Sequence, residues 1–315
     1  MTALQIALLI AACVVGAFLL FFFLPTMLIS NVIYTTLLVR KNKKKWSREC
    51  SWEDEEQQRM FDEGKAWGER YSANMTSVEV KSGKLRLVGE YFDFGFDKAA
   101  IIIPGRMETS MYSYYFAEPY RKAGYNVLAI DNRSHGLSDG RYNCLGLKEY
   151  ADITAWAKKL HDELGVKEIV LHGICIGSAT ALNALTFGDA PGYITAMVAD
   201  GMYVSFRESL ANHIKERKHS LFPCLGQVMW MIKTVSGKSA DKYAPINQIK
   251  KLDRPILFIY SREDAYSLPE KGEELFAACA SENKKIVFFD HGAHSHVRIN
   301  NTEKYDETII GFLTE

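Results

Sequence analysis

A glycine–x–cysteine–x–glycine turn is the feature of this sequence most suited to covalent chemistry. Cys175 stands between Gly173 and Gly177, directly after a short apolar run. Glycines at this spacing permit a sharp turn from a strand into a helix, and the turn lifts its central residue out of the sheet. A cysteine at a helix N-terminus is stabilised as the thiolate, its nucleophilic form. The spacing therefore predicts a nucleophilic Cys175, with the amide of Ile176 directed at a developing oxyanion.

Candidate partners for this nucleophile lie in two later loops of the chain. Glu263 and Asp264 follow one apolar run, and His291, His294 and His296 follow another. An imidazole within reach takes the thiol proton and later protonates the leaving group, while a carboxylate fixes the imidazole tautomer and stabilises its charged form. The residues alone leave open which carboxylate and which histidine take these roles.

The same residues also have non-catalytic interpretations. Free cysteines are often buried and inert, although an elbow raises its central residue above the sheet. The spacing His291-x-x-His294-x-His296 has the composition of a metal site. Because no acidic or cysteine ligand flanks it closely, we expect no metal and no cofactor. Ser178 lies inside the expected helix, one residue past the elbow glycine, and is a poor substitute nucleophile.

Short apolar runs alternate with helical patterns along the chain after Thr76. Such runs are typical of strands buried on both faces of a parallel sheet. The expected strands are residues 85–92, 99–103, 127–130, 169–171, 196–199, 256–260 and 286–289. The expected helices are residues 112–123, 148–164, 178–187, 271–280 and 302–313. This alternation predicts an α/β fold with a mostly parallel central sheet, helices on both faces, and ligands at the carboxyl ends of the strands.

Residues 202–244 interrupt the alternation. The stretch combines several basic residues with large apolar ones, namely Phe206, Leu210, Leu221, Phe222, Met229, Trp230 and Met231. We expect a short helical cap inserted over the carboxyl edge of the sheet. A surface rich in methionine and tryptophan suits an apolar acyl group, although core packing explains such residues as well.

The first 39 residues are typical of a membrane anchor. From residue 3 to residue 24 every side chain is apolar except Gln5, and about 20 such residues cross the hydrocarbon layer. Pro25 interrupts the run, a second apolar stretch covers residues 27–39, and a basic cluster covers residues 40–45. Because positive residues concentrate on the cytoplasmic side of a span, we expect one transmembrane helix with the remaining chain in the cytoplasm.

Two secretory interpretations of this segment are weaker. A cleavable signal peptide would begin with a basic region and carry a shorter apolar segment. The sequence Ile10-Ala11-Ala12-Cys13 resembles a lipoprotein cleavage site, but apolar residues continue beyond it. We therefore favour an anchor that stays attached to the chain.

Composition limits the remaining possibilities. The chain has 315 residues, of which 48% are hydrophobic, and this is enough to fill a sizeable core. Its 38 basic and 38 acidic side chains cancel, which argues against a nucleic-acid binder. Six scattered cysteines lack disulfide or zinc spacing, so reduced thiols are expected.

Three regions follow from these patterns. Residues 1–39 are the expected transmembrane anchor, and residues 40–75 form a basic flank and helical linker. Within the linker, residues 49–70 are expected to form an amphipathic helix, with a solvated spacer as the alternative. Residues 76–315 form the α/β domain, which contains the cap.

Together these motifs resemble the α/β-hydrolase superfamily, in particular the serine-aminopeptidase-like (S33-type) membrane-anchored bacterial hydrolases. The resemblance covers about residue 76 to the C-terminus. Besides the elbow, its landmarks are Asp131-Asn132-Arg133-Ser134-His135-Gly136-Leu137-Ser138, Val198-Ala199-Asp200-Gly201, Tyr260-Ser261-Arg262-Glu263-Asp264 with Leu268-Pro269, and His291-Gly292-Ala293-His294-Ser295. Each landmark is weak by itself, and their order along the chain makes the resemblance specific.

The resemblance implies a catalytic triad in the order nucleophile, acid, histidine. Cys175 stands at the nucleophile's position, with cysteine in place of the usual serine. Asp264 and His294 stand at the positions of the acid and the base. Dienelactone hydrolases and bile-acid acyltransferases resemble this arrangement, with cysteine at the same elbow.

For the oxyanion hole, the resemblance implies the backbone amides of Ile176 and Arg106. The family usually has His-Gly in the second loop, whereas this chain has Pro104-Gly105-Arg106-Met107. The substitution keeps the amide of Arg106 and loses the hydrogen bonds of the histidine. The Arg106 side chain is expected to form a surface salt bridge or to bind an anionic substrate group. The remaining polar landmarks, expected to stabilise the structure, are Asp131, Arg133, His135 and Asp200.

The expected activity is hydrolysis of a small-molecule ester or thioester through an acyl-cysteine intermediate. Amide cleavage is less favoured, because a thiolate leaves the tetrahedral intermediate more readily than an amine does. Two alternatives remain. One is an acyltransferase that uses the same acyl-cysteine, and the other is a catalytically inactive, membrane-tethered binding protein that keeps the hydrolase shell.

Overall fold

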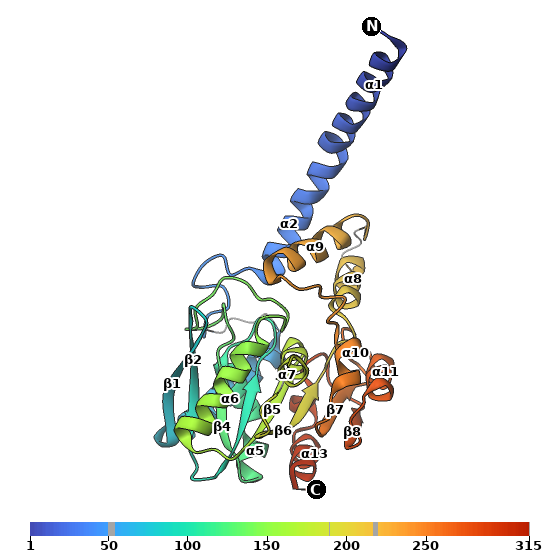
Figure 1. The fold of residues 1–315 in the computed structure, drawn as a ribbon. Coiled ribbons are helices and arrows are strands. Elements are labelled where there is room, and N and C mark those ends of the chain that lie inside the picture. Colours follow the sequence, from blue (N-terminus) through green and yellow to red (C-terminus); the bar gives the residue numbers. More distant parts are fainter. Residues whose placement is uncertain (50–53, 189, 217–219, 315) are drawn as a thin grey trace.

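An eight-stranded sheet forms the centre of the computed structural model, which describes residues 1–49, 54–188, 190–216 and 220–314 (Figure 1). The strand order is β1-β2-β4-β3-β5-β6-β7-β8, with β2 antiparallel to both neighbours and every other pair parallel. The mostly parallel α/β sheet predicted from the sequence is confirmed. The strands are β1 (Met75–Ser82), β2 (Leu85–Phe92), β3 (Lys98–Ile103), β4 (Asn126–Ile130), β5 (Glu168–Ile174), β6 (Ile194–Asp200), β7 (Ile256–Ser261) and β8 (Lys284–Phe289).

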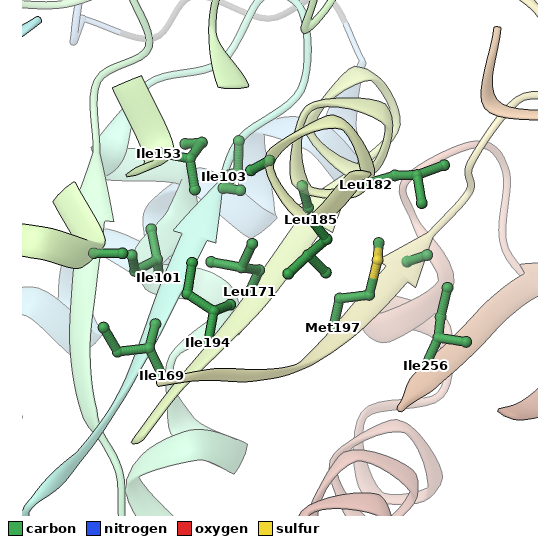
Figure 2. Close-up of a cluster of buried hydrophobic side chains, with 14 of the residues drawn as sticks. Ile101, Ile103, Ile153, Ile169, Leu171, Leu182, Leu185, Ile194, Met197 and Ile256 are labelled. Atoms are coloured by element: carbon green, nitrogen blue, oxygen red, sulfur yellow. The ribbon is translucent and has the colours of Figure 1, made fainter. Parts of the chain in front are cut away.

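Helices cover both faces of the sheet because its central strands are apolar on both sides. On one face, isoleucine and leucine side chains of β3 and β5 pack against α6 (Tyr150–Leu164) and α7 (Ile176–Thr186), as Figure 2 shows. The other face packs against α3 (Glu55–Arg70), α4 (Ser110–Ser113), α5 (Glu118–Lys122) and α13 (Thr302–Thr314). The remaining helices of the domain are α10 (Pro245–Gln248), α11 (Pro269–Ala278) and α12 (Val297–Asn300).

Two parts of the domain differ from the sequence-based expectation. The patterns miss β1, an edge strand whose side chains are exposed or half-buried, so that it lacks a continuous apolar run. The helix expected over residues 112–123 is instead α4, a 3₁₀ turn (Tyr114–Phe116) and α5. Pro119 accounts for the break, because proline has no N–H and favours the first turn of a helix, its position in α5.

A long helix carries the N-terminus away from the sheet (Figure 1). It comprises α1 (Ala3–Phe18), a π-helical turn (Leu19–Phe23) and α2 (Leu24–Leu38), and it is long and apolar enough to cross a membrane. No residue of α1 is buried against the protein. Pro25 lies in the first turn of α2 without breaking the helix. The π turn before it makes room for the proline ring by inserting an extra residue into the hydrogen-bonding pattern.

The basic residues after this helix contact the sheet domain. The Nζ of Lys45 donates to carbonyl groups at the end of α2, where a cation complements the helix dipole. Trp46 stacks on His135 with 4.4 Å between ring centroids. Arg48 pairs with the buried Asp131. Part of the basic flank is therefore used inside the protein.

The helix expected in the linker is present as α3 and packs on the domain. Residues 50–53 of the expected 49–70 helix lie outside the described residues. The Asp54 side chain caps the N-terminus of α3, as aspartate commonly does. Met60 and Trp67 are buried in the core on one face of the sheet. A segment that looks like a spacer in sequence thus contributes to the core.

The inserted stretch forms two cap helices, α8 (Phe206–Glu216) and α9 (Cys224–Ser236), separated in part by residues 217–219, which lie outside the described residues. Figure 1 shows α9 lying across α2, between the N-terminal helix and the domain. Gln227 of α9 accepts from the hydroxyl of Ser30 at 2.6 Å and donates to the hydroxyl of Thr26 at 3.0 Å. An apolar cluster continues this contact and includes Tyr34, Leu38, Leu210, Val228 and Ile232. The lower part of the N-terminal helix and the cap therefore form one packed unit.

Candidate active site

The turn around Cys175 has the geometry of a nucleophile elbow. Cys175 has φ +55° and ψ −110°, a strained conformation for a residue with a side chain. Both flanking glycines are required by close contacts. A Cβ on Gly173 would lie 2.3 Å from the backbone of Gly177, and one on Gly177 would lie 2.1 Å from the carbonyl oxygen of Ile103. The backbone thus has the conformation that the sequence spacing predicts, and Cys175 stands directly before the first turn of α7.

Hydrogen bonds hold the elbow in this conformation. The N–H of Cys175 donates to the carbonyl of Asp200 at 2.8 Å, which ties the turn to the end of β6. The hydroxyl of Ser178 is fully buried and donates to the carbonyl of Gly173 at 2.6 Å. Ser178 therefore braces the elbow, in agreement with its expected unsuitability as a nucleophile.

Asp264 and His294 come from the loops after β7 and β8 and meet beside the elbow. The Nδ1 of His294 lies 2.7 Å from the Oδ2 of Asp264. Asp264 is buried, and its other oxygen accepts from the N–H groups of Tyr266 and Ser267 at 2.8 and 2.7 Å. These two amides fix the carboxylate, which in turn fixes the orientation of the imidazole.

The side chains of Cys175 and His294 are hydrogen-bonded to each other. Burial lowers the pKa of His294, but the charge on the Cys175 sulfur and the hydrogen bonds to Asp264 and Cys175 outweigh it. The pKa of His294 is consequently raised well above its usual value. An imidazolium facing a cysteine sulfur stabilises the thiolate. The three residues at the triad positions thus form one hydrogen-bonded series.

The competing carboxylate and histidines lie elsewhere. Glu263 is exposed, and one of its oxygens lies 3.3 Å from the Nδ1 of the exposed His291. His296 is buried and donates to a glutamine side chain of α3 at 2.7 Å. Of the alternatives that the sequence leaves open, the pair beside the elbow is Asp264 and His294. Among the residues that the structure describes, no group of His, Cys, Asp or Glu side chains is arranged to hold a metal ion.

The other cysteines have different surroundings. Cys144 and Cys279 are buried, and burial raises the pKa of both thiols, that of Cys144 to about 12. Cys224 is buried in the cap, whereas Cys13 is exposed on α1. Cys50 lies outside the described residues. Cys175 differs from these four described cysteines in being half-buried at the wall of a cavity and bonded to an imidazole.

A cavity of about 230 Å³ opens over Cys175 and His294. Much of its wall comes from the cap and from the loop after β3. Two further contributions come from the N-terminal region, through Leu37 at the end of α2 and Gln57 in α3. The larger side chains of the wall are Met107, Tyr203, Phe206 and Tyr266. The segment before residue 75 is therefore part of the site.

Ile176 and Arg106, the two predicted oxyanion donors, both line this cavity. Ile176 begins α7, and the first N–H groups of a helix have no partner within it. The Nε2 of His135 donates to the carbonyl of Arg106 at 2.6 Å, and the Nδ2 of Asn132 donates to that of Pro104 at 3.1 Å. The turn after β4 therefore holds the two peptide groups on either side of the one that carries the N–H of Arg106.

A buried carboxylate that the sequence patterns miss holds the same loop. Glu108 accepts from the N–H of Gly105 at 2.8 Å and from the side-chain amide of Gln57 at 3.1 Å. His296 donates to the side-chain oxygen of Gln57, so that Gln57 links His296 to Glu108. Burial raises the pKa of Glu108 to about 7, against the opposing effect of these hydrogen bonds. A Cβ on Gly105 would lie 2.7 Å from the Glu108 carboxylate, so a larger residue there would displace that side chain.

Asp131 connects this loop to the basic flank. Its Oδ1 accepts from the N–H of Ser110 at 2.9 Å, and its Oδ2 accepts from the N–H of Leu137 and the Nε of Arg48, both at 2.8 Å. A Cβ on Gly136 would lie 2.1 Å from the same carboxylate, which explains the glycine in this motif. The expected structural role of Asp131 agrees with these contacts.

Asp200 is a second buried carboxylate near the triad. It accepts from the hydroxyl of Tyr305 at 2.6 Å. Burial raises the pKa of Asp200 to about 7, although the bond from Tyr305 and the charge of His294 oppose the shift. Its backbone carbonyl holds the N–H of Cys175. These contacts agree with the structural role expected for this residue.

Leu37, Gln57 and Glu108 are the site residues that the sequence analysis misses. Leu37 is one apolar residue among many, and Gln57 is one polar residue in a polar helix. Glu108 offers the only local signal. An acidic side chain three positions after Gly105 can accept from the glycine N–H, as short-range side-chain contacts to the backbone often do.

Comparisons of the sequence with known proteins find a family and several relatives. A family described as alpha/beta hydrolase fold matches residues 99–231. The uncharacterized protein YqkD of Bacillus subtilis is 28% identical over 218 residues, which cover 68% of this chain and 70% of YqkD. An uncharacterized membrane protein of Saccharomyces cerevisiae is 26% identical over 197 residues, which cover 62% of this chain and 63% of that protein.

Solved structures similar to this chain share its architecture. An esterase from Pyrococcus furiosus has a TM-score of 0.66 at 24% identity and matches over 78% of this chain and 93% of its own. An alpha-beta hydrolase from Vibrio vulnificus has a TM-score of 0.64 at 21% identity and matches over 90% and 93%. These similarities show that the chain shares the fold of these structures.

Proposed function

Because this chain belongs to the α/β-hydrolase superfamily, we propose that it is an esterase or thioesterase that forms an acyl-cysteine intermediate. Cys175 is the nucleophile, His294 transfers protons, and Asp264 orients His294. The observation that supports this proposal most directly is the hydrogen-bonded series of these three side chains beside a cavity. An esterase among the similar structures gives independent support.

In the first half-reaction the Cys175 thiolate attacks the carbonyl carbon of the ester. A carbon–sulfur bond forms, and the carbonyl electrons move to the oxygen. The amides of Ile176 and Arg106 hold this oxyanion in the tetrahedral intermediate. The intermediate collapses, the bond to the alcohol or thiol breaks, and His294 gives its proton to the leaving group.

In the second half-reaction water replaces the leaving group. His294 takes a proton from water, and the resulting hydroxide attacks the acyl carbon. Collapse of the second tetrahedral intermediate breaks the carbon–sulfur bond, releases the carboxylic acid and restores the Cys175 thiolate with an imidazolium. Asp264 stabilises the charged imidazole in both halves.

This chemistry favours esters and thioesters over amides. In the first tetrahedral intermediate the cysteine sulfur and the leaving group compete for expulsion. A thiolate leaves more readily than an amine, so an amide substrate would mostly return to its starting state. An alcohol or a thiol competes on better terms.

The cavity favours a short acyl group. Its volume of about 230 Å³ is below the roughly 300–1,000 Å³ of ordinary small-molecule sites. Leu37, Tyr203 and Phe206 give it apolar walls that suit an alkyl chain. Arg106, beside the cavity, provides a positive charge for an anionic leaving group.

We also propose that the N-terminal helix anchors the enzyme in a membrane. The apolar window of this helix is not buried, unlike a core helix of similar composition. Tyr34 and Leu38 are buried in the cap cluster, so removal of the helix as a leader would expose the cap core. The basic cluster at residues 40–45 supports a domain on the cytoplasmic side, by the positive-inside rule.

Hydrolysis of p-nitrophenyl esters by the full-length protein in detergent micelles tests the catalytic proposal. We expect turnover with acetate and butyrate esters and a loss of about 10³-fold or more in Cys175→Ala. Cys13→Ala, which removes an exposed thiol on α1, is the matched control and should retain full activity. Iodoacetamide should inactivate the enzyme while alkylating Cys175.

Two results would point to the alternative functions. Absence of turnover, of a burst of p-nitrophenol and of Cys175 alkylation would indicate a binding protein. Faster p-nitrophenol release when an amine or alcohol acceptor is added, with acylated acceptor as product, would indicate an acyltransferase. Cys175→Ser keeps the shape of the elbow, so a change of activity in this variant reports the chemistry of the nucleophile and not the packing of the turn.

A further inference from the structure

The cap carries exposed apolar side chains next to the N-terminal helix. Phe222 is 77% exposed and Trp230 is 58% exposed. Phe222 lies in the turn directly before α9, and Trp230 lies within α9. The ring of Phe222 lies 6.2 Å from that of Phe22, a residue of the long helix. Large exposed aromatic side chains next to an apolar helix are typical of a surface that contacts a membrane or another protein.

An apolar hollow of about 530 Å³ lies at the same junction. Its N-terminal wall is formed by Phe18, Phe22 and Phe23. Its cap wall is formed by residues 221–223 and 225–227 and by Arg207, whose guanidinium is paired with Asp241. Water in such a hollow would find few hydrogen-bonding partners, whereas hydrocarbon would fill it favourably.

The position of this junction along the helix identifies what covers it. From Ala3 to Phe22 the helix has 20 residues, which span about 30 Å, the thickness of the hydrocarbon layer. The first contact of the cap with a polar side chain of the helix is the bond between Gln227 and Thr26, one turn beyond Phe22. The cap thus meets the helix where the helix leaves the hydrocarbon.

We propose that residues 221–230 of the cap dock into the surface of the bilayer that the N-terminal helix crosses, with lipid acyl chains filling the hollow. This inference rests on the anchoring role proposed for the helix and is independent of the esterase activity. Phe222 enters the edge of the hydrocarbon layer, and Trp230 lies at the level of the headgroups, where tryptophan is enriched.

Docking at two points fixes the height of the active site above the membrane. Leu37 lines the catalytic cavity and lies 15 residues beyond Phe22, about 22 Å further along the helix axis. A helix alone leaves the domain free to tilt, whereas a helix with a docked cap holds the cavity at one distance and orientation. The cap thus serves as the second support of the domain on the membrane.

Tryptophan fluorescence in vesicles tests this proposal without any enzyme assay. Full-length protein and Trp230→Phe are reconstituted into phosphatidylcholine vesicles, and the difference between their emissions reports Trp230. We expect lipids brominated in the upper acyl chain to quench this difference by at least half and aqueous iodide to leave it nearly unchanged. Trp46→Phe is the matched control, because Trp46 stacks on His135 in the domain and its emission should not respond to brominated lipid.

A second variant separates docking from simple proximity. Phe222→Asp places a charge at the hollow, so quenching of Trp230 by brominated lipid should fall more than twofold and quenching by iodide should rise. Phe222→Leu should behave as the unaltered protein. If the protein floats with the vesicles while Trp230 is open to iodide and insensitive to brominated lipid, docking is wrong and anchoring stands. If the protein does not float with the vesicles, both proposals are wrong.

Discussion

The two halves of the candidate site are held in different ways. The nucleophile half consists of Cys175, His294 and Asp264, on loops that directly follow β5, β8 and β7. Neighbouring backbone groups fix these loops, such as the amides that bind Asp264. The oxyanion half is the loop after β3, which is fixed by its own Glu108 and by side chains from other parts of the chain, including His135.

The N-terminal region forms hydrogen bonds with both halves: Gln57 of α3 accepts from His296 in the loop that carries His294 at 2.7 Å, and two further contacts reach the oxyanion half. Gln57 of α3 donates to Glu108 at 3.1 Å, and the guanidinium of Arg106 lies 3.5 Å from the carbonyl oxygen of Leu37 in α2. Trp46 stacks on His135, which binds the Arg106 carbonyl. The difference teaches that the candidate triad is positioned mainly by loops at the edge of the sheet, whereas the candidate oxyanion loop depends more on contacts from residues that precede β1.

Removal of His294, the proposed base, should cause the largest loss of esterase activity. We expect His294→Ala to lower kcat/KM for ester hydrolysis by about 10³–10⁴-fold, because both proton transfers lose their carrier. His291→Ala is the matched control, since His291 is exposed and pairs with Glu263, and its activity should stay within about twofold. Equal losses in the two variants would show that the base is assigned to the wrong histidine.

Loss of the acid should rank next. Asp264→Asn keeps the shape of the side chain and removes the charge that orients His294, so we expect kcat to fall by about 10²–10³-fold. Glu263→Gln makes the same chemical change one residue earlier, on an exposed side chain. We expect less than a threefold change there, as measured with p-nitrophenyl butyrate. The opposite ranking would contradict the roles given to the two carboxylates.

Substitutions in the oxyanion half should reduce activity less, and they should do so by lowering kcat. Glu108→Ala leaves the N–H of Gly105 without its partner, so the loop loses its position and we expect about a tenfold lower kcat with little change in KM. Glu108→Gln keeps an acceptor and should recover most of this loss. Glu270→Ala removes an exposed carboxylate at the start of α11, outside the cavity wall, and serves as the control. A rise in KM without a change in kcat would instead indicate that Glu108 contributes to substrate binding.

The same carboxylate should affect how stability depends on pH. The pKa of Glu108 is raised to about 7 in the folded protein from an ordinary value of 4.5. Between these values the folded state keeps a proton that the unfolded state releases, so the stabilisation from Glu108 is lost as pH rises. Relative to the unaltered protein, Glu108→Gln should therefore gain stability from pH 4.5 to 7, by up to roughly 3 kcal/mol, and then level off. Thermal unfolding in detergent across this range measures the difference, and a flat difference would contradict the buried, protonated carboxyl.

The two halves also differ in how far the sequence predicts them. Cys175, Asp264 and His294 follow short apolar runs, and parallel strands bring their carboxyl ends to one edge. The order of strands was therefore enough to expect the candidate loops at one edge, and the resemblance to the hydrolase family selected Asp264 and His294 within them. Gln57 and Glu108 meet only because α3 folds back on the domain, and its polar sequence resembles a spacer.

The same contrast applies to the fold. Buried strands such as β3 and β7 carry continuous apolar runs and were predicted closely, whereas the edge strand β1 has a mixed pattern because half of its surroundings is solvent. The apolar N-terminal helix was evident from composition. Its contact with the cap was not, since Ser30 and Gln227 lie 197 residues apart and neither residue type signals the other.

Mass spectrometry of the acyl-enzyme tests the central claim most directly. Full-length protein is mixed with a p-nitrophenyl ester, quenched in acid within the burst, and digested. The account predicts the mass of one acyl group on the peptide that contains Cys175, its removal by hydroxylamine, and its absence in Cys175→Ala. Product release without any adduct on this cysteine, or with the adduct on another residue such as Ser178, would contradict it.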